Sequence, residues 1–230
     1  AEDGIRDVAV TGVQTCALPI SRYAREAKRR YQATQVTTKT LIAPAASRCG
    51  LSKERTMTSR IPFLSSVLAS EGMYCVVGLK KGAPRQTFVD TLEEIDGVVE
   101  GLMAQGYDTY FGCAKYLNAA EGRTAQNAKW FKSFWLDLDC GESKPYETQS
   151  DALDALKQFV KDTGLPRPTI VNSGRGVHAY WTLTEAIFYN DWKPTAEAFK
   201  KFCAAYDLHA DPAVTADAAR ILRIPETLNF

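Results

Sequence analysis

Two aspartates one residue apart are the clearest candidates for chemistry in this chain. Asp137 and Asp139 stand in the apolar run 134–141, FWLDLDCG. In a β-strand, side chains at i and i+2 leave by the same face, so the two carboxylates would lie side by side, about 6.5–7 Å apart at the backbone. A buried carboxylate is costly unless it is paired or bound to a metal. The spacing therefore predicts a site for divalent cations, with a solvated surface strand as the alternative.

A second candidate site is the segment 169–181, TIVNSGRGVHAYW. Its pattern predicts a strand, a tight Gly-Arg-Gly turn and a returning strand, which would gather Ser173, Arg175 and His178 at one end of a hairpin. Backbone amides beside glycines, a guanidinium and an imidazole together favour an anion, most often phosphate. The alternative is an ordinary hairpin with its histidine in the core. A dinucleotide fingerprint does not fit, because no Gly-x-Gly-x-x-Gly leads from a strand into a helix.

The C-terminal segment holds a third candidate carboxylate, Asp211, followed by two arginines three residues apart, Arg220 and Arg223. Asp217 is the fallback for the third carboxylate, and it would otherwise cap a short helical turn. A solvated surface charge would explain Arg220. It explains Arg223 less well, because that residue stands between leucine and isoleucine.

Strands and amphipathic helices alternate around these segments. The patterns predict an α+β fold in which a mixed β-sheet core with flanking helices carries the acids and the histidine to one cleft. Ser150 is the expected N-cap of one helix. The expected strands are 73–79, 109–116, the Asp-x-Asp strand of 134–141 and the two strands of the hairpin 169–181, and the expected helices are 91–103, about 150–161 and about 192–206.

The first 56 residues differ from the rest. Residues 10–20 resemble the translation of a widely used DNA-sequencing adapter and residues 1–7 its outer part, so residues 1–20 are interpreted as a sequencing artefact. Residues 21–56 carry nine Lys or Arg against two acids. Either they are a basic arm for nucleic acid, or they are a non-native or disordered leader before Met57, which we favour. The folded domain is expected to span 57–230.

Composition limits the partners of this domain. Residues 1–56 hold ten of the 28 basic and five of the 27 acidic residues, so the remainder has more acids than bases. Contact with nucleic acid would then need a local basic patch. The cysteines after Met57 form no Cys-x-x-Cys pair, which argues against a zinc ribbon or a disulfide framework. No apolar run approaches a membrane span and no signal peptide precedes the domain, so a cytoplasmic setting is expected.

Taken in series, the three motifs resemble the archaeo-eukaryotic primase superfamily, specifically its phage- and plasmid-type primase-polymerase catalytic domains. The resemblance rests on the Asp-x-Asp strand, the Ser-Gly-Arg-Gly-x-His hairpin, and the segment Arg-Ile-Leu-Arg-Ile-Pro after Asp211, and it covers about residues 57–230. It implies an RRM-like catalytic core. The implied activity is template-dependent nucleotidyl transfer, in primer synthesis or DNA polymerisation during phage or plasmid replication in a bacterial cytoplasm.

The resemblance also implies a role for each matching position. Asp137, Asp139 and Asp211 would hold metal and act in catalysis together with His178. The residues that would bind the nucleotide are Ser173, Arg175, His178, Arg220 and Arg223. Two ions of Mg²⁺ or Mn²⁺ are implied, one arriving with the nucleotide. The implied partners are a single-stranded DNA template, an NTP or dNTP, and a helicase domain or subunit encoded downstream, with no membrane.

Two departures from the family pattern qualify this resemblance. Glu226 stands where related domains tend to have glycine, and the chain stops at Phe230, so the domain is expected to be incomplete at its C-terminus and this fragment to lack residues needed for activity.

Two other functions remain open. A nucleotide-sugar glycosyltransferase also uses Asp-x-Asp with Mn²⁺, although that function leaves the hairpin and the Arg-Ile-Leu-Arg-Ile-Pro segment unexplained. A non-catalytic replication-initiation module would bind origin DNA without needing Asp137 or Asp139.

Overall fold

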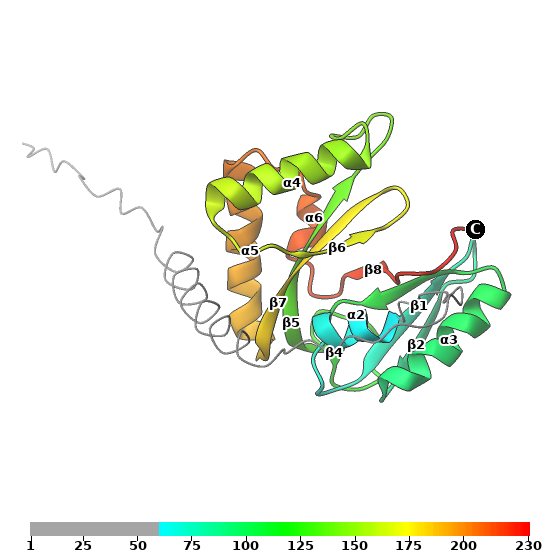
Figure 1. Ribbon diagram of the computed structural model, residues 1–230. Coiled ribbons are helices and arrows are strands. Elements are labelled where there is room, and N and C mark those ends of the chain that lie inside the picture. The colour runs from blue at the N-terminus through cyan, green and yellow to red at the C-terminus, as the bar shows by residue number, and fades with distance from the viewer. Residues whose placement is uncertain (1–59) are drawn as a thin grey trace, which may run out of the picture. The chain divides into compact units, whose positions relative to one another are not determined.

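The computed structural model of the protein describes residues 60–230, which belong to one compact unit, Gly50–Phe230. The predictions for residues 1–20 and 21–56 concern positions outside the described residues. Within residues 60–230, strands form two four-stranded sheets (Figure 1). The first, in spatial order, is β2 (Arg85–Val89), β1 (Tyr74–Leu79), β3 (Asp108–Gly112) and β8 (Ile221–Arg223); the second is β4 (Lys115–Tyr116), β5 (Ala128–Asp139), β7 (Gly176–Phe188) and β6 (Thr169–Asn172).

The predicted α+β class is confirmed, with the β core divided between these two sheets. Neighbouring strands pair antiparallel in both sheets, and an isolated bridge between Cys140 and Tyr146 is parallel. The longest ladder joins β5 to β7, the two strands that contain the Asp-x-Asp and His motifs. Because register fixes which side chains meet across a ladder, this pairing determines what faces each aspartate.

The helices of the described region are α2 (Arg60–Val67), α3 (Leu92–Ala104), α4 (Gln149–Thr163), α5 (Tyr189–Ala205) and α6 (Pro212–Thr215). The predicted helix 91–103 is confirmed as α3, which Thr91 caps in a reciprocal capping box with Glu94. The predicted cap of α4 was wrong by two residues. Thr148, not Ser150, is the N-cap, because its side chain accepts from the amide of Asp151. None of the helices in residues 60–230 is long and apolar enough to cross a membrane.

Four short elements of the described region were missed by the sequence patterns: α2, β2, α6 and β8. Helix α2 is short and has no marked apolar face, and β2 is an edge strand in which only Val89 is buried. Because an exposed edge strand needs little alternation of apolar and polar residues, β2 gives a weak local signal.

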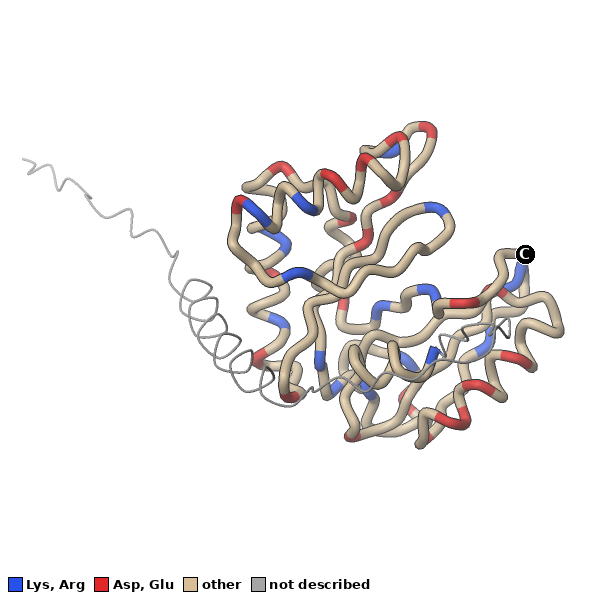
Figure 2. Tube along the Cα trace, in the orientation of Figure 1, with Lys and Arg blue, Asp and Glu red and all other residues tan. Residues whose placement is uncertain are grey.

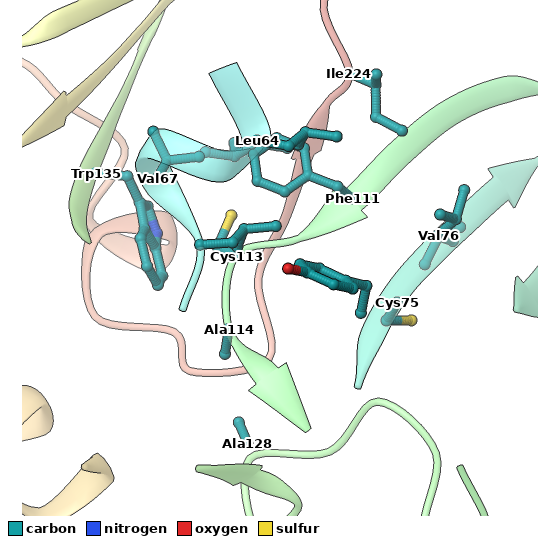
Figure 3. Close-up of a cluster of buried hydrophobic side chains, with 14 of the residues drawn as sticks. Leu64, Val67, Cys75, Val76, Phe111, Cys113, Ala114, Ala128, Trp135 and Ile224 are labelled. Carbon is teal, nitrogen blue, oxygen red and sulfur yellow. The ribbon is translucent and has the colours of Figure 1, made fainter. Parts of the chain in front are cut away.

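A first hydrophobic cluster joins the two sheets. Figure 3 shows side chains of α2, β1 and β3 meeting Trp135 of β5 and Ile224, next to β8. The ring of Tyr180 on β7 lies 5.2 Å from that of Phe63 and 6.3 Å from that of Phe111 on β3. Rings from both sheets and from α2 thus pack together, which fixes the two sheets next to each other.

A second hydrophobic cluster covers the opposite face of the β5–β7 ladder. Leu136 and Leu138 of β5 pack there against residues of α4 and α5, including Leu156 and Phe199. Trp135 belongs to the first cluster instead. Side chains therefore alternate along β5: the leucines face the helices, whereas Trp135, and with it the two aspartates at i+2 and i+4, face the side where the sheets meet.

Candidate functional site

The β5–β7 ladder places Asp137 directly opposite His178. Oδ1 of Asp137 lies 3.6 Å from Nε2 of His178, and both side chains are largely buried. Asp139, two residues further along β5, is opposite Gly176, and its carboxylate is more exposed. Two of the three motifs predicted from sequence therefore meet at one end of a single pair of strands.

Close backbone packing explains why a glycine stands at the start of β7. A Cβ built on Gly176 would lie 2.4 Å from the carbonyl oxygen of Leu138, closer than any side chain can approach. The amide of Cys140 also donates to the carbonyl of Arg175 at 3.0 Å. The turn of the hairpin is thus held tightly against the end of β5, and Ser173 closes it by donating its amide to the carbonyl of Gly176.

The third carboxylate adjoins this pair. The backbone amide of Asp211 donates to the carbonyl of Asp137 at 2.9 Å, and the Asp211 side chain caps α6 by accepting from the amide of Ala213. Asp217 has different partners: its carboxylate accepts from the amide of Ala219 and lies 4.0 Å from Arg220. Of the two candidates, Asp211 is therefore the one placed beside Asp137.

Burial and neighbouring charge make Asp137 an unusual carboxyl group. Burial, followed by the charge of Asp139, raises its pKa to about 6; Arg220 opposes this rise, and the influences of Asp211, which raises the pKa, and Lys144, which lowers it, are smaller still. The negative form of Asp137 is thus poorly compensated by the residues around it. A bound cation would relieve this repulsion.

His178 has the opposite shift. Burial, helped by the positive charges of Arg223 and Arg220, lowers its pKa to about 4, and Asp139 opposes this weakly. The imidazole is neutral at pH 7, so its contact with Asp137 is not an ion pair. Its Nδ1 lies 3.5 Å from the hydroxyl of Tyr180. His178 is thus buried, as the core alternative expects, and also adjacent to the aspartate, as the site hypothesis expects.

Arg223 is fixed by a tyrosine that the sequence patterns did not single out. Its guanidinium donates to the hydroxyl of Tyr110 at 2.8 Å and lies 4.8 Å from the centre of that ring. It also pairs with Asp108 at 3.4 Å. Burial raises the pKa of Tyr110, while Arg223 and Arg175 lower it. Tyr110 therefore senses positive charge from β8 and from the hairpin turn.

Arg220 is held mainly through its backbone and the turn before it. Its carbonyl accepts from the amide of Cys113 at 2.9 Å, and Arg123, a residue the sequence patterns missed, donates to the carbonyl of Ala219. Figure 2 shows basic positions on the β6–β7 turn and along the segment that contains β8. Arg220 lies within electrostatic range of Asp137 and Arg223 within that of His178, and the carbonyl of Arg175 accepts from the amide of Cys140. The side chain of Ser173 has no contact that defines a role.

The three aspartates offer the type of ligand atom that a hard divalent cation binds. Asp137, Asp139 and Asp211 supply carboxylate oxygens, which are the ligands that Mg²⁺ and Mn²⁺ prefer. Among residues 60–230, however, no group of three or more His, Cys, Asp or Glu is arranged to hold a metal ion, and the carboxylate of Asp139 pairs with Lys144 at 2.7 Å. The aspartates are neighbours without forming a closed set of ligands, which suits a site completed by substrate oxygens.

Comparison with known proteins gives two similar solved structures. No protein-family model matches the chain, and no curated protein matches it. The AEP domain of the Cyanophage S-2L primase-polymerase is 15% identical with a TM-score of 0.48, over 66% of this chain and 72% of that one. Primase RepB′ is 13% identical with a TM-score of 0.44, over 74% of this chain and 49% of that one. Neither likeness is close enough to assign a function to this chain.

Proposed function

We propose that this domain transfers a nucleotidyl group from a nucleoside triphosphate to a 3′-hydroxyl on a single-stranded DNA template. The observation that carries the proposal is the meeting of three sequence motifs around Asp137: His178 opposite it on β7, Asp211 bonded to its carbonyl, and arginines within electrostatic range. Acids beside arginines are what a reaction between a hydroxyl and a polyphosphate requires.

The aspartates are assigned to cation binding. Asp137, Asp139 and Asp211 would hold Mg²⁺ or Mn²⁺ together with phosphate oxygens of the nucleotide, and two such ions would supply activation of the hydroxyl and neutralisation of the phosphates. Asp137 is the central member, because burial, and after it the charge of Asp139, raises its pKa, so its negative form would be stabilised by a bound cation.

The basic residues are assigned to the triphosphate. Arg220 and Arg223 come from the end of the chain and Arg175 from the hairpin turn, so they would approach the phosphates from two directions. Guanidinium groups suit this role because they bind phosphate oxygens through paired donors. His178, neutral at pH 7, would donate a hydrogen bond to a phosphate without adding charge.

Two alternative functions would give different results in the test below. A nucleotide-sugar glycosyltransferase would use the acids for a diphosphate, and a replication-initiation module would bind duplex DNA without using them. A helicase encoded downstream remains a prediction from the resemblance.

The direct test is incorporation of labelled nucleotide. The purified protein is incubated with a single-stranded template, Mn²⁺ or Mg²⁺, and either NTPs or dNTPs, with and without an annealed primer. Products are then resolved on a denaturing gel. We expect template-dependent products with at least one nucleotide set. Hydrolysis of UDP-sugars without incorporation would support the glycosyltransferase, and tight duplex binding without incorporation would support the initiation module.

A further inference from the structure

Lys144 contacts Asp139, one member of the acidic pair. Lys144 lies on the loop between β5 and α4, and its Nζ is 2.7 Å from Oδ2 of Asp139. The hydrogen bond and charge of Asp139 raise the pKa of Lys144, and the charges of Asp137 and Asp211 raise it further. One ammonium group therefore lies within electrostatic range of all three carboxylates.

The loop holds this lysine in place through its backbone. Gly141 adopts a φ of +125°, which favours glycine. The amide of Lys144 donates to the carbonyl of Gly141 at 3.0 Å, and the amide of Gly141 donates to the carbonyl of Tyr146 at 2.9 Å. The buried Tyr146 in turn accepts, through its hydroxyl, from the amide of His209 at 3.0 Å. The turn with Lys144 is thus tied to the segment that precedes Asp211.

We propose that Lys144 is the resident counter-ion of the carboxylate cluster, which consists of Asp137, Asp139 and Asp211, and that a divalent cation must displace its ammonium group to bind there. This proposal rests on the proposed function. Because Lys144 and a cation compete for an oxygen of Asp139, the lysine weakens cation binding and offsets part of the negative charge of the cluster when no cation is present.

An ion pair of the same length on α4 provides the control. Lys157 pairs with Asp154 on α4, also at 2.7 Å, and both side chains are well exposed. That pair involves one carboxylate outside the cluster, and pairs of this kind contribute little to stability. If Lys144 were an ordinary surface partner of Asp139, its removal would behave like removal of Lys157.

The first experiment measures Mn²⁺ binding to the metal-free protein, without nucleotide, by electron paramagnetic resonance of the free ion. Lys144→Gln should bind Mn²⁺ about fivefold more tightly than the parent, because one competing charge is gone. Lys144→Arg and Lys157→Gln should bind like the parent. Unchanged or weaker binding by Lys144→Gln would overturn the competition between lysine and metal.

The second experiment needs no metal, so it separates this proposal from the proposed function. In EDTA, Lys144→Gln should lower the melting temperature more than Lys157→Gln does. The loss should shrink in the Asp139→Asn background, as a double-mutant cycle would record. Additive effects in the cycle would contradict the counter-ion role. If neither the parent nor Lys144→Gln binds Mn²⁺ at millimolar concentration, the competition between lysine and metal is overturned, and the cycle alone decides whether Lys144 is a counter-ion of the cluster. The proposed function, whose ions also use phosphate oxygens of the nucleotide, is tested separately by the incorporation assay.

Discussion

Asp137 and His178 face each other across the β5–β7 ladder, with 3.6 Å between Oδ1 and Nε2, and their pKa values shift in opposite directions. Burial is the largest cause for both residues, and it disfavours whichever form carries charge. The pKa of Asp137 rises to about 6 and that of His178 falls to about 4. Near pH 5 both groups are therefore mostly uncharged in the folded protein.

These shifts predict opposite pH dependences of stability. Asp137 stabilises the folded protein below pH 4, and this contribution is lost as pH rises to about 6. His178 contributes stability above pH 6.5, which is lost as pH falls to about 4. In the parent protein, these two changes in the free energy of unfolding with pH largely offset each other. In Asp137→Asn, the free energy of unfolding should rise by about 1–3 kcal/mol between pH 4 and 6.5, because only the His178 contribution remains. In His178→Gln, it should fall by about 1–3 kcal/mol over the same range, because only the Asp137 contribution remains.

Urea denaturation at half-unit pH steps measures these slopes. Asp154→Asn, an exposed carboxylate on α4, serves as the control and should follow the parent. Slopes of the same sign in the two variants would show that at least one of the shifts has been assigned the wrong direction.

Gly176→Ala should disrupt the site through the backbone. The added methyl group would meet the carbonyl oxygen of Leu138 at 2.4 Å, so the hairpin must move away from β5, at a cost of about 2–4 kcal/mol in the free energy of unfolding. Gly97→Ala on α3 is the matched control, because its added methyl group meets nothing within 4 Å and should stabilise the helix by about 0.5–1 kcal/mol. Equal melting temperatures for the two variants would contradict the close packing.

Lys115 predicts a second pH effect, away from the site. It is fully buried, its Nζ has no hydrogen-bond partner among the described residues, and it lies 2.8 Å from the centre of the Tyr74 ring. Burial lowers its pKa to about 7, so the folded protein loses stability as pH falls from about 10 to 7. Lys115→Met should therefore stabilise the protein by about 1–3 kcal/mol at pH 6, less so at pH 10.

Thermal melts at both pH values test this effect. The exposed Lys80, 5.5 Å from the centre of the Tyr107 ring, is the control, and Lys80→Met should show no such pH dependence. A destabilised Lys115→Met at pH 6 would mean that the contact with Tyr74 outweighs the burial of charge.

Local patterns in the sequence predicted those features of the fold and the site that depend on residues close together in the chain. The two-residue spacing of Asp137 and Asp139 set their shared face, and the Gly-Arg-Gly turn indicated the hairpin. The pairing of Asp137 with His178 depends on register between distant strands, which local periodicity does not reveal. Tyr110 illustrates the same limit, because an ordinary strand residue becomes the partner of Arg223 only when β3 and β8 pair.

Substitution of Arg223 and substitution of Arg220 should have different effects on stability. Arg223 contacts Tyr110 and Asp108, so Arg223→Ala should lower the free energy of unfolding by about 1–3 kcal/mol in addition to weakening nucleotide binding. Arg220 is more exposed and lies 4.0 Å from Asp217, so Arg220→Ala should change stability by less than about 1 kcal/mol. Both should raise the Kd for a fluorescent nucleotide triphosphate. Unchanged nucleotide affinity in both variants would remove them from the triphosphate site.

Extension of a labelled primer by the Asp137→Asn variant tests the central claim most directly. Substitution by asparagine keeps the shape of the side chain and removes its charge, so nucleotide affinity should stay within a few-fold of the parent while the Mn²⁺-dependent extension rate falls at least about 100-fold. Asp154→Asn should extend like the parent. Extension by Asp137→Asn at the parent rate, in the same Mn²⁺ buffer, would contradict the assignment of Asp137 to the catalytic metal site.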